Sequence, residues 1–300
     1  MQYDALYNIP GLRVTRDAPL SEMTTFRIGG PCDLLCEPDT PEAAIELFRI
    51  LPELHCPWTV LGRGSNTLCA DSGFRGIVIR PLTGGGAERL FGDRVRVAAG
   101  MPLPRLSAFA RDEGLAGLSF AQGIPGCVGG GLCMNSGAYE HTLSECVESV
   151  LCLCPGGEVR TIPQDACAFG YRESIFRRER VMALSAILKL SKGDPAAIGE
   201  EMRAYGERRA ASQPLEFPSA GSVFKRPEGY FAGKLIQDAG LKGQRIGGAE
   251  VSEKHAGFIV NRGGASARDV LLLISLIQER VEALFGVRLE REVCLLGFEE

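Results

Sequence analysis

The order of apolar and polar residues predicts alternating helices and strands at the start of the chain. Thr40 caps a helix start and Pro41 suits its first position, so we expect a helix over residues 42–51. The apolar segments 57–61 and 76–80 predict two strands. This alternation is typical of a small α/β lobe.

The pattern changes near residue 94 to one typical of antiparallel strands. Strands are predicted over residues 95–99, 148–154, 158–162 and 181–190, with a helix over 103–113. Pro155-Gly156-Gly157 between the second and third strands is a hairpin signal. The polar, turn-forming segment 192–195 is the best boundary candidate.

The last third predicts two helices and a final strand. One helix fits residues 197–211. A second begins with a capping-box pattern at Ser266 and Asp269, carries an apolar stripe at helical spacing and ends at Gly286. The final strand is expected over residues 292–296. The fold class is α+β, in three parts: residues 1–80, 81–195 and 196–300.

Charge and composition narrow the function classes. The 300 residues carry a net charge of −4 without a basic block, so no nucleic-acid partner is expected. No apolar run reaches the roughly 18 residues of a membrane span, and the N-terminus, Met1-Gln2-Tyr3-Asp4, lacks the features of a secretory signal. Eleven cysteines without a CxxC pair predict reduced thiols that pack as small hydrophobes. We expect a cytoplasmic protein without a metal site.

Two glycine loops are the first chemical signal. Gly62-Arg63-Gly64-Ser65-Asn66 follows an apolar strand, and Gly123-Ile124-Pro125-Gly126-Cys127-Val128-Gly129-Gly130-Gly131 follows some sixty residues later. Such loops expose backbone N–H groups that bind anions, commonly a diphosphate. Neither loop has the lysine of a P-loop, and the first lacks the GxGxxG spacing. Together they predict a dinucleotide held outside a Rossmann or P-loop site.

Three further segments are polar where the local pattern predicts otherwise. They cover residues 169–176, 218–225 and 289–293. Taken singly, each has a plain structural interpretation: Arg172 as a surface arginine, Ser222 as a turn residue and Glu292 as a solvated strand-end carboxylate.

Together these segments resemble a known family. The motifs are RIGG (27–30), GRGSN (62–66), GIPGxVGG (123–130), MNSGAY (134–139), GYRESIF (170–176), SAGSVFK (219–225), DAGLKG (238–243) and EREV (290–293). In this order the chain resembles the UDP-N-acetylenolpyruvoylglucosamine reductase (MurB) family over residues 20–297. The resemblance implies a two-lobed FAD-binding region of the vanillyl-alcohol-oxidase or PCMH type, with lobes at 1–80 and 81–195, and a substrate domain at 196–300.

The resemblance also implies a reaction. NADPH would reduce non-covalently bound FAD, and a hydride from flavin N5 would then reach C3 of the enolpyruvyl ether of UDP-N-acetylglucosamine. A proton at C2 would complete UDP-N-acetylmuramate. The enzyme would serve peptidoglycan synthesis, and through it cell wall biogenesis, cell shape and cell division. The family resemblance favours a monomer without a membrane partner.

Residue roles follow from the same resemblance. Ser222 corresponds to the proton donor, Arg172 to the arginine that holds and polarises the substrate carboxylate, and Glu292 to the catalytic glutamate. We expect the pKa of Glu292 to be raised beside an anionic substrate. Lys225 is a candidate to support Ser222 and, with Arg226, Lys242 and His255, to bind the substrate. The two glycine loops would bind FAD through Gly62, Arg63, Gly64, Ser65, Asn66, Gly123, Ile124, Pro125, Gly126, Gly129 and Gly130.

The chain departs from the family pattern in places. Arg226 stands where an asparagine is common, so its contact is open. The link from Lys225 to Leu235 is too short for the loop that carries a substrate-covering tyrosine, as in the shorter, type II branch. What covers the uridine end of the substrate is therefore not identified, and Cys127 and Cys133 are expected only to pack.

Two alternatives stay open. A PCMH-type oxidase acting on another alcohol would need a histidine or cysteine near the glycine loops for covalent flavin attachment, and Cys69 is the only awkward candidate beside the first loop. A non-catalytic UDP-sugar binding protein would have no need of Arg172, Ser222 and Glu292 together.

Overall fold

The computed structural model describes residues 3–82 and 85–298, and their contacts divide the chain into two compact units. Unit 1 contains residues 1–16, 34–62 and 76–208, and unit 2 contains residues 17–33, 63–75 and 209–300. Each unit is discontinuous in sequence, because residues 17–33 and 63–75 group with the C-terminal part of the chain. The three-part division stays a prediction.

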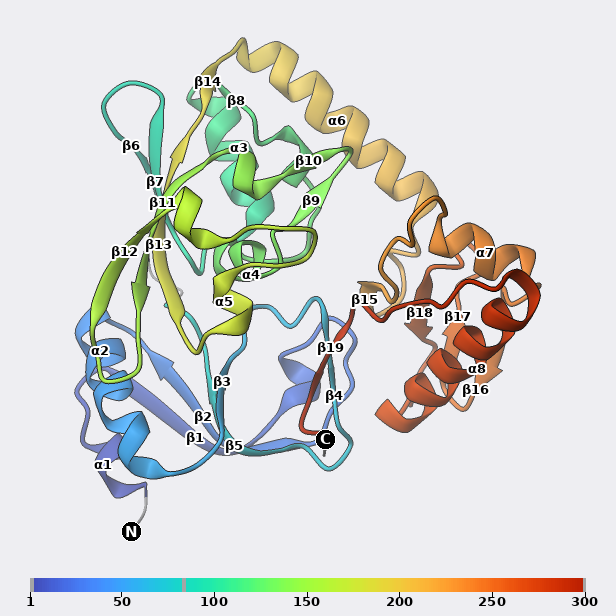
Figure 1. The fold of residues 1–300 in the computed structure, drawn as a ribbon. Helices are drawn as coiled ribbons and strands as arrows, with labels where there is room; N and C mark the ends of the chain where they lie inside the picture. Colours follow the sequence, from blue (N-terminus) through green and yellow to red (C-terminus); the bar gives the residue numbers. More distant parts are fainter. Residues whose placement is uncertain (1–2, 83–84, 299–300) are drawn as a thin grey trace. The chain divides into compact units, whose positions relative to one another are not determined.

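The first sheet has the strand order β1-β2-β5-β3 (Figure 1). Its strands are β1 (Leu12–Pro19), β2 (Pro31–Pro38), β5 (Phe74–Ile79) and β3 (Trp58–Val60). Helix α2 (Pro41–Ile50) begins as predicted, since the Thr40 side chain accepts the N–H of Ala43 at 3.2 Å. Its buried residues, among them Leu47 and Phe48, join a core with Ile77 and Ile79 of β5.

The second sheet of unit 1 is antiparallel, with the strand order β12-β11-β13-β7-β6. Its strands are β6 (Ala87–Arg89), β7 (Arg94–Ala98), β11 (Val147–Leu153), β12 (Val159–Pro163) and β13 (Met182–Lys189). The strands at 95–99, 148–154, 158–162 and 181–190 are therefore confirmed within two residues. Helix α3 (Leu103–Asp112) buries Leu103 and Leu106 in the core of this sheet.

Shorter elements complete unit 1. They are α1 (Asp4–Tyr7), β8 (Leu115–Ala116), α4 (Val128–Cys133), β9 (Gly137–Ala138), β10 (His141–Thr142), α5 (Ile175–Arg178) and β14 (Ser191–Lys192). Helix α6 (Pro195–Ser212) confirms the helix predicted over residues 197–211. The two units divide inside this helix, between Arg208 and Arg209.

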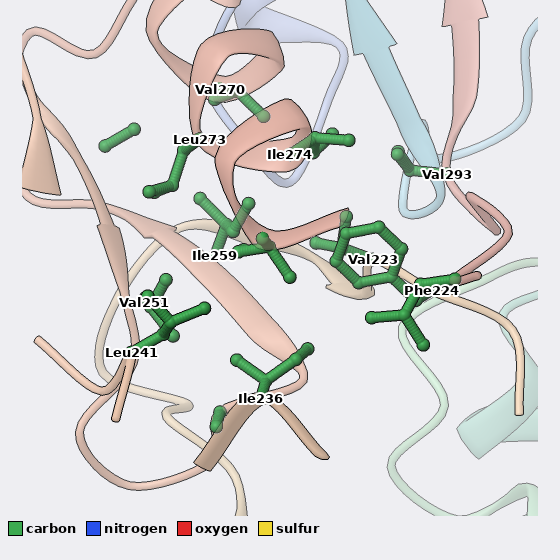
Figure 2. Packing of buried hydrophobic residues seen from close by; sticks show 14 of the residues in the cluster. Val223, Phe224, Ile236, Leu241, Val251, Ile259, Val270, Leu273, Ile274 and Val293 are labelled. Atoms are coloured by element: carbon green, nitrogen blue, oxygen red, sulfur yellow. The ribbon is translucent and has the colours of Figure 1, made fainter. Parts of the chain in front are cut away.

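Unit 2 is built on a sheet with the order β15-β18-β17-β16 and helices α7 and α8 (Figure 1). The elements are β15 (Ser219–Ser222), α7 (Ala232–Asp238), β16 (Arg245–Ile246), β17 (Ala249–Val251), β18 (Phe258–Asn261) and α8 (Ala267–Phe285). The apolar stripe of α8 is core, as predicted: Val270, Leu273 and Ile274 belong to one buried cluster with Ile259 of β18, and Figure 2 shows Leu273 pointing toward Ile259.

A parallel strand pair connects the first glycine loop to the C-terminal segment. Strand β4 (Thr67–Cys69) follows the loop directly, and β19 (Cys294–Leu296) pairs with it. The predicted strand over residues 292–296 thus begins two residues later than expected. Strands β1, β2 and β4 are not among the predicted elements, because their apolar positions are too few or too irregular to mark a period.

All eleven cysteines are free thiols, and eight of them are buried. Burial raises the pKa of the Cys69 thiol to about 12. The Cys69 thiol therefore stays protonated and packs as a hydrophobic side chain. In residues 3–82 and 85–298, no helix is both long and apolar enough to span a bilayer.

The N-terminus of α8 provides a test of pH-dependent stability. The Asp269 carboxylate accepts the N–H of Ser266 at 2.9 Å in a capping box, and these hydrogen bonds lower the pKa of Asp269. A lowered pKa gives stability above the unfolded-state pKa that is lost as the pH falls through the folded-state pKa. Asp269→Asn should thus cost about 1 kcal/mol at pH 7 and clearly less at pH 3. Urea unfolding of unit 2 helices, followed by circular dichroism, measures both values.

Glu279→Gln is the matched control, because Glu279 is an exposed carboxylate in the same helix, outside its first turn. It should leave the unfolding midpoint nearly unchanged at both pH values. An Asp269→Asn loss that is equal at pH 7 and pH 3 would contradict the assignment.

Candidate functional site

The first glycine loop has unused backbone donors. Gly64 is buried, and no protein acceptor in the described residues receives the N–H groups of Gly62, Arg63, Gly64 or Ser65. A buried N–H group without an acceptor is costly and rare in folded proteins. The loop therefore fits an anionic ligand such as a diphosphate, as its sequence predicts.

Close packing explains why the loop needs glycine. Gly64 has φ +59°, and a Cβ there would lie 2.5 Å from the carbonyl oxygen of Met23 and 2.8 Å from the Cα of Thr24. A Cβ on Gly62 would lie 2.9 Å from the Cys127 sulfur. The backbone can approach its neighbours and a ligand only because both side chains are absent.

The second glycine segment differs from the predicted loop. Cys127 is the N-cap of helix α4, so Gly129 and Gly130 lie in its first turn. The N–H of Gly129 donates to Ala99 at 2.7 Å, and that of Ile124 donates to Ala121 at 3.1 Å. These two N–H groups are occupied by protein carbonyls. Backbone N–H groups that donate to a ligand must therefore come from the other residues of this segment. Gly129 and Ile124 stay predicted cofactor contacts, but their contacts would have to be van der Waals contacts and not N–H hydrogen bonds.

Cys127 lies beside two glycines of unit 1, Gly62 and Gly130. Its buried sulfur lies next to the positions that a Cβ would take on Gly62, at 2.9 Å, and on Gly130, at 3.8 Å. Cys127 therefore packs, as the sequence indicates.

Arg172 occupies a strained turn of unit 1. Its φ is +57°, a left-handed conformation that non-glycine residues rarely adopt. Gly170 and Glu173 exchange backbone hydrogen bonds on either side, and the Arg177 guanidinium donates to the carbonyl of Arg172 at 2.8 Å. Strained residues persist where the surroundings over-determine them, and they gather at functional sites. The turn is therefore held in one conformation.

Asn135 and Ser174 fasten this turn to the protein interior. Asn135 is buried; its amide donates to the carbonyl of Gly170 at 3.0 Å and its oxygen accepts the N–H of Ser144 at 3.0 Å. The hydroxyl of fully buried Ser174 donates to the Cys133 carbonyl at 2.8 Å. Sequence reasoning assigned neither residue. The signal was available, because Asn135 lies in the MNSGAY motif and Ser174 in GYRESIF.

Ser222 lies at the end of β15 in unit 2. It pairs with Phe258, after an irregular register that Gly221 makes possible with φ +75°. The next residues, Val223 and Phe224, are buried in the core that Figure 2 shows. Because Val223 and Phe224 are held in the core, the backbone position of Ser222 next to them is fixed.

Glu292 is brought close to this segment. Its N–H donates to the carbonyl of Val223 at 2.7 Å, and the N–H of Val293 donates to the same oxygen at 3.3 Å. Glu292 is 9% exposed, and Val293 beside it joins the core. The structure thus places Ser222 and Glu292 on adjacent segments of unit 2, while Arg172 belongs to unit 1.

Lys225 has an ion-pair partner. Its Nζ lies 3.0 Å from the Glu290 carboxylate, and its N–H donates to the Glu290 carbonyl at 2.8 Å. In the described contacts, Lys225 therefore fastens the segment after Ser222 to the segment before Glu292. The neighbouring Arg226 stacks its guanidinium on Phe231, 4.0 Å from the ring centroid.

His255 is a neutral hydrogen-bonding group. Its Nδ1 accepts the N–H of Gly257 at 3.1 Å, which leaves the proton on Nε2. Burial lowers the pKa of His255, and the charge of Lys242 lowers it further. The charge of Lys242 therefore acts on His255, and both predicted substrate residues belong to unit 2.

Comparison with known proteins defines the class. Residues 32–163 match the FAD binding domain family. A berberine bridge enzyme variant, 14% identical, shares the fold with a TM-score of 0.50 over 65% of this chain and 44% of its own. The chain has the fold of PCMH-type FAD-binding proteins, with an α+β C-terminal domain.

The particular family follows from nearly full-length matches. Residues 213–296 match the C-terminal domain of UDP-N-acetylenolpyruvoylglucosamine reductase. The reductase of Alkaliphilus oremlandii is 46% identical over 97% of this chain and 96% of its own, and that of Geobacillus kaustophilus 44% over 99% and 98%. The crystal structure of the Thermus caldophilus enzyme, MurB, is 34% identical with a TM-score of 0.81, over 95% of this chain and 99% of that one. The chain belongs to the UDP-N-acetylenolpyruvoylglucosamine reductase family.

The first glycine loop can be tested by adding one methyl group. Gly64→Ala should reduce the FAD content of the purified protein at least tenfold, because a Cβ at φ +59° collides with the Met23 carbonyl and deforms the loop. The ratio of flavin to protein absorbance measures the content. Gly206→Ala is the control, since a Cβ there meets nothing within 4 Å. Full flavin content in Gly64→Ala would refute the role of the loop.

Proposed function

We propose that this protein catalyses the NADPH-dependent reduction of the enolpyruvyl ether of UDP-N-acetylglucosamine to UDP-N-acetylmuramate. The relatives over nearly the full length carry the name of this reductase. The observation that carries the proposal is the backbone connection between the Ser222 and Glu292 segments at the Val223 carbonyl. This connection supports the proposal because it holds next to each other the segments that carry a hydroxyl and a carboxylate, two groups that can take part in proton transfer.

The chemistry divides between the cofactor and the chain. FAD, when bound, supplies the hydride that it receives from NADPH. Ser222 donates a proton to C2 of the substrate, and Glu292 supports that transfer through the local hydrogen-bond network. A serine hydroxyl is a weak acid, so it needs such support to act at neutral pH.

Arg172 holds the substrate carboxylate in this proposal. Charge develops on that group when C3 accepts hydride, and the planar guanidinium matches a carboxylate with two parallel donors. The left-handed turn, braced by Asn135 and Arg177, supports this role because it fixes the backbone that carries the side chain. Little reorganisation is then needed during the reaction.

Substrate recognition falls to the cations and the neutral histidine of unit 2. Lys242 supplies charge for the diphosphate, and the Nε2–H of His255 supplies a directed donor without a second charge. Lys225 and Arg226 frame the segment after Ser222. We assign the reaction to peptidoglycan synthesis in the cytoplasm and the active form to a monomer.

The two alternatives have less support. A covalent flavin oxidase would need a reactive thiolate, but burial raises the pKa of Cys69 to about 12. A non-catalytic binding protein has no use for the paired Ser222 and Glu292 segments or for the strained turn at Arg172.

The serine assignment is tested by separating the two half-reactions. Ser222→Ala should be reduced by NADPH at the wild-type rate, because Ser222 takes no part in that step. Reoxidation by the enolpyruvyl substrate should slow at least about 100-fold, the lower range for losing a positioned acid. Anaerobic stopped-flow absorbance of the flavin follows both steps. Reoxidation at the wild-type rate would show that Ser222 is not the proton donor.

The glutamate assignment is tested by pH. The rate of reoxidation by substrate should depend on one ionisation in the wild type that disappears in Glu292→Gln, since the amide cannot titrate. Glu279→Gln is the control, because Glu279 is an exposed carboxylate of helix α8 and is not assigned to catalysis. A pH profile with the same ionisation in both variants and the wild type would exclude Glu292.

A further inference from the structure

The side chain of Asn66 faces the catalytic segment. Its amide Nδ2 donates to the main-chain carbonyl of Glu292 at 3.2 Å and lies 3.8 Å from the Cys294 sulfur. The Asn66 carbonyl accepts the N–H of Cys294 at 3.0 Å. The last residue of the first glycine loop therefore binds the backbone of residues 292–294 from both its main chain and its side chain.

The strand pairing in unit 2 brings Asn66 next to residues 292–294. Strands β4 and β19 run parallel, with Thr67 opposite Cys294 and Cys69 opposite Leu296. Parallel neighbours begin at the same edge of a sheet. The residues that precede them, Asn66 before β4 and Val293 before β19, consequently meet at that edge, and Glu292 lies one residue further back.

A continuous chain of hydrogen bonds connects the loop to the serine segment. Asn66 holds the Glu292 carbonyl, and the Glu292 N–H donates to the carbonyl of Val223, which directly follows Ser222. Both main-chain groups of Glu292 are thus held, one by the glycine loop and one by the strand end that carries Ser222. The carbonyl of a residue that is 9% exposed would lack this donor without Asn66.

We propose that Asn66 is the positioning residue for Glu292. The hydrogen bond from Asn66 to Glu292 then connects the loop proposed to bind the diphosphate with the segment proposed to support proton transfer. Asn66 thus acts on the proton-transfer step through Glu292. The inference rests on the proposed function. The inference goes beyond the proposed function because it gives the asparagine side chain of the GRGSN motif a role in the chemistry on the substrate.

The experiment is a double-mutant cycle on the FAD-saturated protein. Asn66→Ala should slow reoxidation by the enolpyruvyl substrate roughly 10-fold to 100-fold, the effect of a misplaced catalytic group, and change reduction by NADPH less than about threefold. In the Glu292→Gln background, the same substitution should add less than about a threefold loss, because residues that act through one group are not additive. The pH profile of reoxidation should shift when Asn66→Ala is made in the wild type, and it should not shift when Asn66→Ala is made in the Glu292→Gln background.

Two further variants keep the result interpretable. Asn66→Leu keeps a branched side chain of similar size and removes the N–H donor without adding a charge, so it should give the same pattern if Asn66→Ala does not fold or hold FAD. Cys294→Ala removes the second, weaker contact of the amide and leaves the bond to Glu292, so reoxidation should stay within about twofold of the wild type. The FAD dissociation constant and the thermal midpoint of each variant are measured alongside.

The outcomes are distinct. Fully multiplicative losses in the cycle, or equal slowing of both half-reactions, would overturn the positioning role and leave Asn66 as a cofactor or stability residue. If the wild type does not reduce the enolpyruvyl substrate at all, the proposed function fails, which is a different result from an altered cycle.

Discussion

The carbonyl oxygen of Val223 is the point on which the arrangement of unit 2 depends. It accepts the N–H groups of Glu292 and Val293, which joins a strand end near the start of the domain to the last segment of the chain. Val223 and Val293 are both buried in the core, so the junction cannot slide without opening that core. The backbone that carries Ser222 and Glu292 is therefore held both by the hydrogen bonds to the Val223 carbonyl and by the packing of Val223 and Val293 in the core.

The two glycine segments do different physical work although their sequences look alike. The first leaves N–H groups unused beside a buried Gly64, which suits an anionic group of the cofactor. The second starts helix α4, and the N–H of Gly129 donates to Ala99, so glycine there allows close packing against the turn that follows β7. Composition alone cannot separate these uses, because both require the absence of a side chain.

Backbone strain is concentrated in one stretch of unit 1. Asn135, Tyr139, Glu140, Ala168 and Arg172 all have positive φ. Buried hydrogen bonds from Asn135 and Ser174 offset the cost and hold the turn that carries Arg172. This is the reverse of the arrangement at Ser222, where a regular core supplies the rigidity. The protein therefore positions its predicted catalytic residues by two different means.

Local sequence determined much of this protein. Hydrophobic periodicity and caps located the central strands, α2, α3 and α8 within a few residues, and the motif set identified the family and the candidate residues Arg172, Ser222 and Glu292, because caps and periodicity act between near neighbours. Tertiary structure alone decided that the N–H of Gly129 donates to the Ala99 carbonyl, that Lys225 pairs with Glu290, and that the Asn66 amide donates to Glu292, 226 residues away. Such pairings depend on which strands become neighbours, and no short-range pattern records that choice.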